Sequence, residues 1–150
     1  KYEEEIQETK KRIEELRKIE IEEDDDSKPK LYEEYWFIDG YGEAHREFWN
    51  YLYGDTYRFD IGNVFKTEKE AKHEVERRKV LTELKKFSRE FKYGLSNYYI
   101  EYDYHNENIT YMLCYTDIIP SICFESKERF KEAIEAVGED RIKKYLLGVE

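Results

Sequence analysis

The chain has little of what many functional sites require. Its 150 residues include two prolines, two cysteines and three histidines, and its seven glycines are scattered. The glycines form no phosphate-cradling loop, and no apolar run approaches the roughly 18 residues of a membrane span. Cys114 and Cys123 lie in apolar, strand-like contexts, which favours reduced core thiols over a disulfide or a metal pair. We therefore expect a soluble, cytoplasmic protein with no contact to a membrane.

Positive charge is the second shortage. Lys and Arg number 26 against 36 Asp and Glu, and the net charge is -10. Such a balance disfavours binding to nucleic acid or to anionic membranes and favours partners with a basic surface. The one basic cluster, at Arg77–Lys79, is interleaved with glutamates and is typical of a solvated helix face. The acidity favours a basic protein partner, or it serves only to keep the chain soluble.

Catalytic constellations are also missing. His45, His73 and His105 fall in a predicted strand, helix and turn, with no second ligand at a spacing that favours metal. Neither cysteine has a basic neighbour that would lower its pKa. The sequence therefore predicts no catalytic residues, no metal site, no cofactor and no enzymatic activity. An enzyme would be favoured only if the fold brought His45 or His105 beside Cys114 or a carboxylate cluster in a pocket.

An amphipathic helix is predicted for the N-terminal arm, residues 1–22. Ile6 and Ile13 occupy a positions and Leu16 a d position of a heptad repeat, and Glu20 ends the apolar seam. This residue choice suits a parallel coiled coil. The arm either dimerises or grips a partner helix, or it folds back on its own domain, because about three heptads are marginal as an isolated coil.

A hinge and an α+β domain are predicted to follow. Residues 23–30 carry acids and a proline and form an acidic hinge, which leaves residues 31–150 as the domain. Residues 31–38 read as a strand that turns at 39–42 and pairs with 43–49. A further turn is expected at Gly54-Asp55.

Two capped helices give the domain a weak ββα-type internal repeat. A short strand near Val64 and Phe65 leads to Thr67, whose hydroxyl can cap a helix while Glu70 reaches back to the amide of Thr67. The same pattern, a short strand followed by a helix-capping hydroxyl, recurs where residues 122–125 lead to Ser126. A short C-terminal helix is expected over 139–147. The fold class is thus α+β, a mostly antiparallel sheet covered by the two capped helices.

The most distinctive predicted surface is a hairpin that begins at Asn97. Alternation places Tyr99, Glu101 and Asp103 on one strand face, and Glu107 lies in the turn. No Lys or Arg occurs from residue 97 to residue 125. Tyrosine rings supply contact area and carboxylates pair with basic groups, so this acidic hairpin suits a positively charged groove. Alternatively, its tyrosines are core and its acids face solvent, as in ordinary half-buried sheets.

The predicted arm and hinge are followed by Tyr35–Gly42, Ile61–Ala71, Leu84–Phe87 and Gly138–Glu150. Segments in this order resemble a group of small proteins encoded by phages and prophages of Gram-positive bacteria. The resemblance covers nearly the whole chain, but it transfers no catalytic residues. Phage accessory proteins of this size include inhibitors of host defence such as anti-CRISPR proteins, which implies a location in the bacterial host cytoplasm.

Two hypotheses of function follow. In the first, the chain is a binding protein, such as an anti-CRISPR or other anti-defence inhibitor, that occupies the basic nucleic-acid groove of a host nuclease such as a CRISPR effector. Its contacts would be Tyr99, Glu101, Asp103 and Glu107. In the second, it is a phage structural or assembly module that forms a homodimer or grips a partner helix through residues 1–22, by way of Ile6, Ile13 and Leu16.

Overall fold

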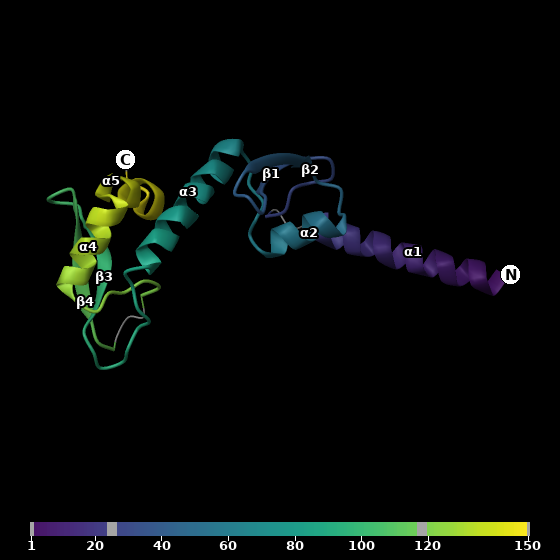
Figure 1. Cartoon of the computed structure of the whole chain (residues 1–150). Helices are drawn as coiled ribbons and strands as arrows, with labels where there is room; N and C mark the ends of the chain where they lie inside the picture. The colour runs from purple at the N-terminus through teal and green to yellow at the C-terminus, as the bar shows by residue number, and fades with distance from the viewer. Residues whose placement is uncertain (1, 24–26, 117–119, 150) are drawn as a thin grey trace. The chain divides into compact units, whose positions relative to one another are not determined.

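The computed structural model describes residues 2–23, 27–116 and 120–149, and for residues 17–23 the backbone alone (Figure 1). The chain is an α+β protein, as the sequence predicts. No helix in the described residues is both long enough and apolar enough to cross a membrane. In chain order the elements are α1 (Tyr2–Glu23), β1 (Glu34–Ile38), β2 (Ala44–Phe48), α2 (Tyr53–Asp60), α3 (Glu68–Lys85), β3 (Asn97–Asp103), β4 (Asn108–Cys114), α4 (Lys127–Val137), α5 (Glu139–Ile142) and the π-helix η1 (Lys143–Leu147).

Contacts divide the chain into two compact units, Lys1–Lys72 and His73–Glu150. Each unit holds one two-stranded antiparallel sheet, β1–β2 in the first and β3–β4 in the second. The sequence predicted one mostly antiparallel sheet, so its division into two hairpins is a finding of the structure. The predicted arm is helical from residue 2 onward, and residue 1 of the arm and residues 24–26 of the predicted hinge lie outside the described residues.

The first hairpin pairs β1 with β2 in antiparallel fashion, as predicted, and its register places Phe37 opposite His45. Its first strand begins three residues later than the sequence suggests. Tyr32 has a positive φ of 63°, and the N–H of Glu33 donates to the carbonyl of Lys30, so this stretch forms a turn. Gly42, with φ of 84°, supplies the left-handed residue that closes the β1–β2 turn.

Aromatic rings form the core of the first unit. Tyr35 and Trp49 are almost fully buried and pack edge to face, with centroids 5.8 Å apart. Trp49 packs in the same way on Phe59 of α2. The predicted turn at Gly54-Asp55 is wrong, because both residues lie in α2. The carboxylate of Asp55 in the first turn of α2 accepts the N–H of Asn50, and negative charge at this end of a helix is favourable.

A third segment completes each unit. Phe65 exchanges both backbone hydrogen bonds with Trp36 of β1 at 2.8 Å. Thr67 then caps α3 by accepting the N–H of Glu70, as predicted. The carboxylate of Glu70 reaches the N–H of Lys66, one residue before the amide that we predicted. The predicted strand near Val64 and Phe65 is a single bridge.

The second unit repeats this plan. Phe124 exchanges both backbone bonds with Tyr98 of β3, at 2.7 and 3.0 Å, and Ser126 caps α4 by accepting the N–H of Arg129 at 3.1 Å. Twice along the chain a hairpin is followed by a segment that bridges its first strand and then by a helix with a hydroxyl cap, although α3 begins in the first unit and continues into the second. The predicted internal repeat is therefore present in the connectivity.

Helices cover one face of the β3–β4 hairpin. Half-buried Tyr98, Ile100, Ile109 and Tyr111 pack against the apolar core of this unit. Tyr111 and Phe130 of α4 meet edge to face at 5.5 Å. The fully buried part of the core comprises Val80, Leu84, Phe124, Phe130, Ala133, Val137 and Ile142.

Candidate interaction surface

The opposite face of the β3–β4 hairpin is the surface on which the predicted contacts lie. Residues directly opposite each other in an antiparallel pair share a face, and the register pairs Tyr99 with Met112, Glu101 with Thr110 and Asp103 with Asn108. We call these six residues the hairpin face. Glu101 and Asn108 are exposed, Met112 is 45% exposed, and the other three are half-buried. The surface therefore combines apolar, hydroxyl and acidic groups.

Tyr99 and Glu101 are neighbours on the hairpin face, and burial and Glu101 both affect the pKa of Tyr99. Partial burial raises the pKa of the Tyr99 phenol, and the negative charge of Glu101 raises it further. Tyr99 therefore keeps its hydroxyl protonated and able to donate a hydrogen bond. Neither β3, β4 nor the turn between them contains a Lys or Arg.

Asp103 stabilises the turn of the hairpin, a role that the sequence did not predict. Its Oδ1 accepts the backbone N–H of His105 at 2.8 Å and of Asn106 at 3.2 Å, and its Oδ2 accepts the side-chain amide of Asn106 at 2.7 Å. These bonds, led by the one from the Asn106 side chain, lower the pKa of Asp103. The carboxylate thus holds the hairpin turn.

Glu107 lies at the tip of the hairpin rather than on the hairpin face. It adopts a positive φ of 52°, and its carbonyl accepts a hydrogen bond from Lys143 Nζ at 2.7 Å. Its side chain is exposed. The structure therefore brings Tyr99 and Glu101 together, places Glu107 beyond the strand, and commits Asp103 to the turn.

The apolar seam of the arm is open to solvent. Ile6, Ile13 and Leu16 are 52%, 45% and 55% exposed. They recur at the spacing of one helix face, and Thr9 between them donates its hydroxyl to the carbonyl of Glu5. No described residue covers this seam enough to bury any of the three.

The first hairpin holds a cluster of polar groups that the sequence did not predict. Asp39, Glu43 and His45 each offer one ligand atom, and these atoms lie within 4.8 Å of one another. His45 Nε2 is 2.8 Å from Asp39 Oδ2, while Asp39 Oδ1 accepts the N–H groups of Tyr41 and Glu43. The tight turn brings the three together, so the signal lay in the turn glycines. The hydrogen bonds to Asp39 stabilise the turn, which accounts for the cluster. They also lower the pKa of the Asp39 carboxyl.

A buried polar network supports the first unit. Asp55 is 3% exposed, and its Oδ1 accepts the hydroxyl of Tyr35 at 2.6 Å. Arg58 donates to the same hydroxyl at 2.7 Å and lies over the ring of Phe37. Burial, with the hydrogen bond to Asp55, raises the pKa of Tyr35 to about 12. Each of the three side chains thus has a hydrogen-bond partner within the network, which makes the network part of the core of the first unit.

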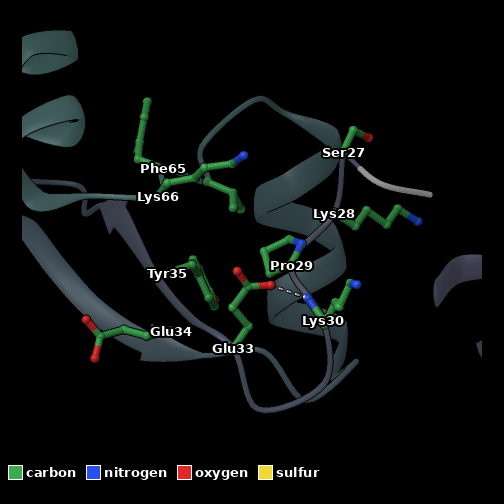
Figure 2. A pocket seen from close by; sticks show the side chains of 10 residues that line it. Ser27, Lys28, Pro29, Lys30, Glu33, Glu34, Tyr35, Phe65 and Lys66 are labelled. Atoms are coloured by element: carbon green, nitrogen blue, oxygen red, sulfur yellow. Dashed lines mark hydrogen bonds between the residues drawn. The ribbon is translucent and has the colours of Figure 1, made fainter. Parts of the chain in front are cut away.

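A small hollow in the first unit has a mixed lining (Figure 2). Its volume is about 200 Å³, below the range typical of ligand pockets. Lys28, Lys30 and Lys66 are offset by Glu33 and Glu34, and the carboxylate of Glu33 accepts the N–H of Lys30 at 2.7 Å. This hollow assembles no nucleophile and base.

The cysteines have no catalytic setting. The thiols of Cys114 and Cys123 donate to the backbone carbonyls of Asn97 and Arg89, and burial raises the pKa of Cys123. His105 lies in the hairpin turn, whereas Cys114 lies at the far end of β4. The fold thus does not bring this pair together.

Comparisons with protein-family models, curated proteins and solved structures found no match to the chain. The function is therefore inferred from the surfaces of the molecule.

Proposed function

We propose that the chain is a non-enzymatic protein-binding inhibitor that uses the hairpin face and the tip residue Glu107 to occupy a basic groove of a host nuclease. The observation that carries the proposal is the pairing of half-buried Tyr99 with exposed Met112 and of exposed Glu101 with half-buried Thr110, on a strand pair that contains no Lys or Arg. Aromatic and methionine side chains are favoured at protein interfaces, and carboxylates complement the Arg and Lys that line a nucleic-acid groove.

The proposed setting is the cytoplasm of a bacterial host, with a phage as the source of the gene and a CRISPR effector nuclease as the leading target class. The acidic net charge supports competition with nucleic acid, because both present negative charge to the same groove. The phage origin rests on the resemblance of sequence, and the step from phage accessory protein to defence inhibitor is an analogy.

The test is binding to purified CRISPR effector nucleases with and without guide RNA, measured by surface plasmon resonance. Glu101→Lys combined with Glu107→Lys should abolish binding, and prior loading of the groove should compete with the chain. The matched control is Glu128→Lys with Glu135→Lys, which makes the same charge change at exposed positions of α4. Equal loss in both double variants, or binding unaffected by either, would contradict the proposal.

A second candidate function is favoured by the exposed arm. We infer from the open seam of Ile6, Ile13 and Leu16 that α1 can pair with another helix, as a phage assembly module would. Introducing charge at Ile13 should then abolish assembly while the charge reversals at Glu101 and Glu107 leave it intact. The two candidates therefore differ in which variants abolish binding.

A further inference from the structure

The β3–β4 hairpin has one edge that the described chain does not pair. Tyr98 exchanges both of its backbone hydrogen bonds with Phe124, so the outer side of β3 is covered and β4 lies at the margin of the sheet. Hydrogen-bonding direction alternates along an antiparallel pair. The N–H and C=O groups of Tyr98 point away from β4, so those of its partner Leu113 point away from β3. By the same alternation, the backbone N–H and C=O groups of Tyr111 and Ile109 also point away from β3.

The contacts of Ile109 agree with this alternation. Its N–H donates to Glu139 Oε1 at 3.1 Å, so the C-terminal region covers the edge near the hairpin tip. For Tyr111 and Leu113 no backbone hydrogen bond on the outer side is found within the described residues. These two residues therefore leave two N–H and two C=O groups available on the edge.

β4 also lacks the features by which sheet edges are protected. Natural edge strands carry charged residues, proline or bulges that discourage pairing. Residues 108–116 contain neither charge nor proline, and β4 pairs with β3 without interruption. Met112 on the hairpin face and Leu113 on the other face are 45% and 39% exposed. The edge is thus suited to accept a further strand.

We propose that the edge of β4 at Tyr111 and Leu113 takes up an extended, basic segment of the partner protein as an added strand. This inference rests on the proposed function and deepens it, because it states how the partner is held. A residue placed opposite Thr110 would project on the hairpin face, with the short threonine between it and Glu101. An Arg or Lys there is long enough to reach the carboxylate of Glu101. The position two residues along the added strand would lie beside Met112 on the same face, and the positions between would project on the other face beside Tyr111 and Leu113, where apolar side chains fit.

A second copy of this chain fits the edge less well. Antiparallel pairing of two β4 strands would bring two acidic hairpin faces side by side, and the net charge of each chain is -10. Like charges disfavour such a contact. The absence of any cation from residue 97 to residue 125 instead favours a partner that supplies the positive charge.

The experiment uses the full ¹⁵N-labelled chain and an eight-residue peptide of alternating arginine and valine as the probe. Binding should slow hydrogen exchange at the amides of Tyr111 and Leu113. The fully N-methylated peptide keeps the charges but has no backbone donors, so its affinity should be lower by at least about fivefold, the effect of one lost hydrogen bond. Equal affinity for the two peptides would overturn strand addition.

Leu113→Pro removes an outward donor without touching the bonds between β3 and β4. It should weaken peptide binding by about fivefold or more, whereas Leu113→Thr, which keeps the N–H, should retain most of the affinity. Exchange protection at Met112, whose N–H points toward β3, verifies that the hairpin is intact.

The variants separate failure of this inference from failure of the proposed function. If Glu101→Lys abolishes binding and Leu113→Pro does not, the acidic surface stands and strand addition is wrong. If neither variant changes binding, both the proposed binding surface and strand addition are wrong. If the chain alone sediments as a dimer that Leu113→Pro disrupts, a second copy occupies the edge and the partner assignment is overturned.

Discussion

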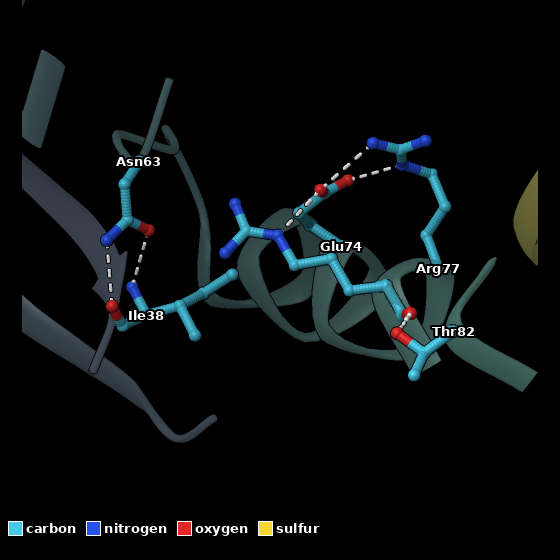
Figure 3. Close-up of polar contacts among 6 residues, drawn as sticks. Ile38, Asn63, Glu74, Arg77 and Thr82 are labelled. Carbon is cyan, nitrogen blue, oxygen red and sulfur yellow. Dashed lines mark hydrogen bonds and ion pairs between the residues drawn. The ribbon is translucent and has the colours of Figure 1, made fainter. Parts of the chain in front are cut away.

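Asn63 holds both backbone groups of Ile38: Ile38 N–H donates to Asn63 Oδ1 at 2.9 Å, and Asn63 Nδ2 donates to the Ile38 carbonyl at 2.7 Å (Figure 3). In the second unit Asn97 makes the same pair of bonds. Its Oδ1 accepts the N–H of Lys92 at 3.0 Å, and its Nδ2 donates to the Lys92 carbonyl at 2.9 Å. Both asparagines are buried. A side-chain amide thus replaces a neighbouring strand where the chain provides none.

Asn63→Ala should lower the free energy of unfolding of the first unit by about 2–4 kcal/mol, because two buried backbone groups of Ile38 lose their partners. Urea denaturation followed by tryptophan fluorescence measures the change. Asn108→Ala, at an exposed strand position, is the control and should stay within about 0.5 kcal/mol of the parent. Similar curves for the two variants would show that the Asn63 bonds contribute little.

Tyr35→Phe should destabilise the first unit by about 1–3 kcal/mol at neutral pH, since Asp55 and Arg58 lose the shared hydroxyl. The folded-state pKa of Tyr35, about 12, lies above the ordinary value of about 10. This contribution is therefore complete below pH 10 and is lost as the pH rises toward 12. Denaturation at pH 8 and pH 11 should show the parent losing stability relative to Tyr35→Phe. A constant difference across this window would contradict the assignment.

Acid should loosen the β3–β4 turn. The pKa of Asp103 is lowered in the folded chain, so its stabilising effect is present above the ordinary value of about 3.9 and is lost as the pH falls through the folded value. The amide shifts of His105 and Asn106 should titrate with Asp103 in the parent. In Asp103→Asn this titration should vanish. Amide shifts that move identically in both chains would point to another group.

Binding to a basic target should depend on ionic strength. Raising salt from 50 to 500 mM should lower the association rate more than it changes the dissociation rate, because charges on the hairpin face are exposed and screened. Stopped-flow measurements separate the two rates. The Glu101→Lys and Glu107→Lys double variant should lose the salt dependence. An association rate that is insensitive to salt in the parent would argue against electrostatic recognition.

The arm makes a separate prediction. If α1 pairs with a second copy, sedimentation at tens of micromolar should give a dimer for the parent and a monomer for Ile13→Asp. Lys11→Asp, on the opposite side of the heptad from the seam, adds an acid without touching the seam and should remain dimeric. A monomeric parent would remove self-association of the arm.

Local signals in the sequence predicted much of the fold. The hydroxyl caps at Thr67 and Ser126, the glycine-bearing turn after Ile38 and the alternation around Tyr99 depend on neighbouring residues, and the structure contains each of them. Helix α2 was missed because Gly54-Asp55 has the composition of a turn. Burial of Asp55 against Tyr35 and Asn50 overrides that local preference.

The candidate site was less predictable. The face that carries Tyr99 and Glu101 could be grouped by strand alternation, but which face the helices cover depends on Phe130 and other residues far along the chain. The role of Asp103 in the turn had only a local signal in the sequence. Asp103 precedes the two amides that it binds, those of His105 and Asn106, by two and three residues. The open edge of β4 required knowing that Phe124 pairs with Tyr98 rather than with β4.

The shared plan of the two units also bears on how the chain is made. Each unit is closed by a bridge to its own first strand, Trp36 with Phe65 and Tyr98 with Phe124, so neither closure waits for the other. Synthesis delivers the N-terminal residues first, and domains generally fold as units. The first unit has all of its strand partners before the ribosome reaches β3. Folding can thus proceed as two short searches instead of one long search.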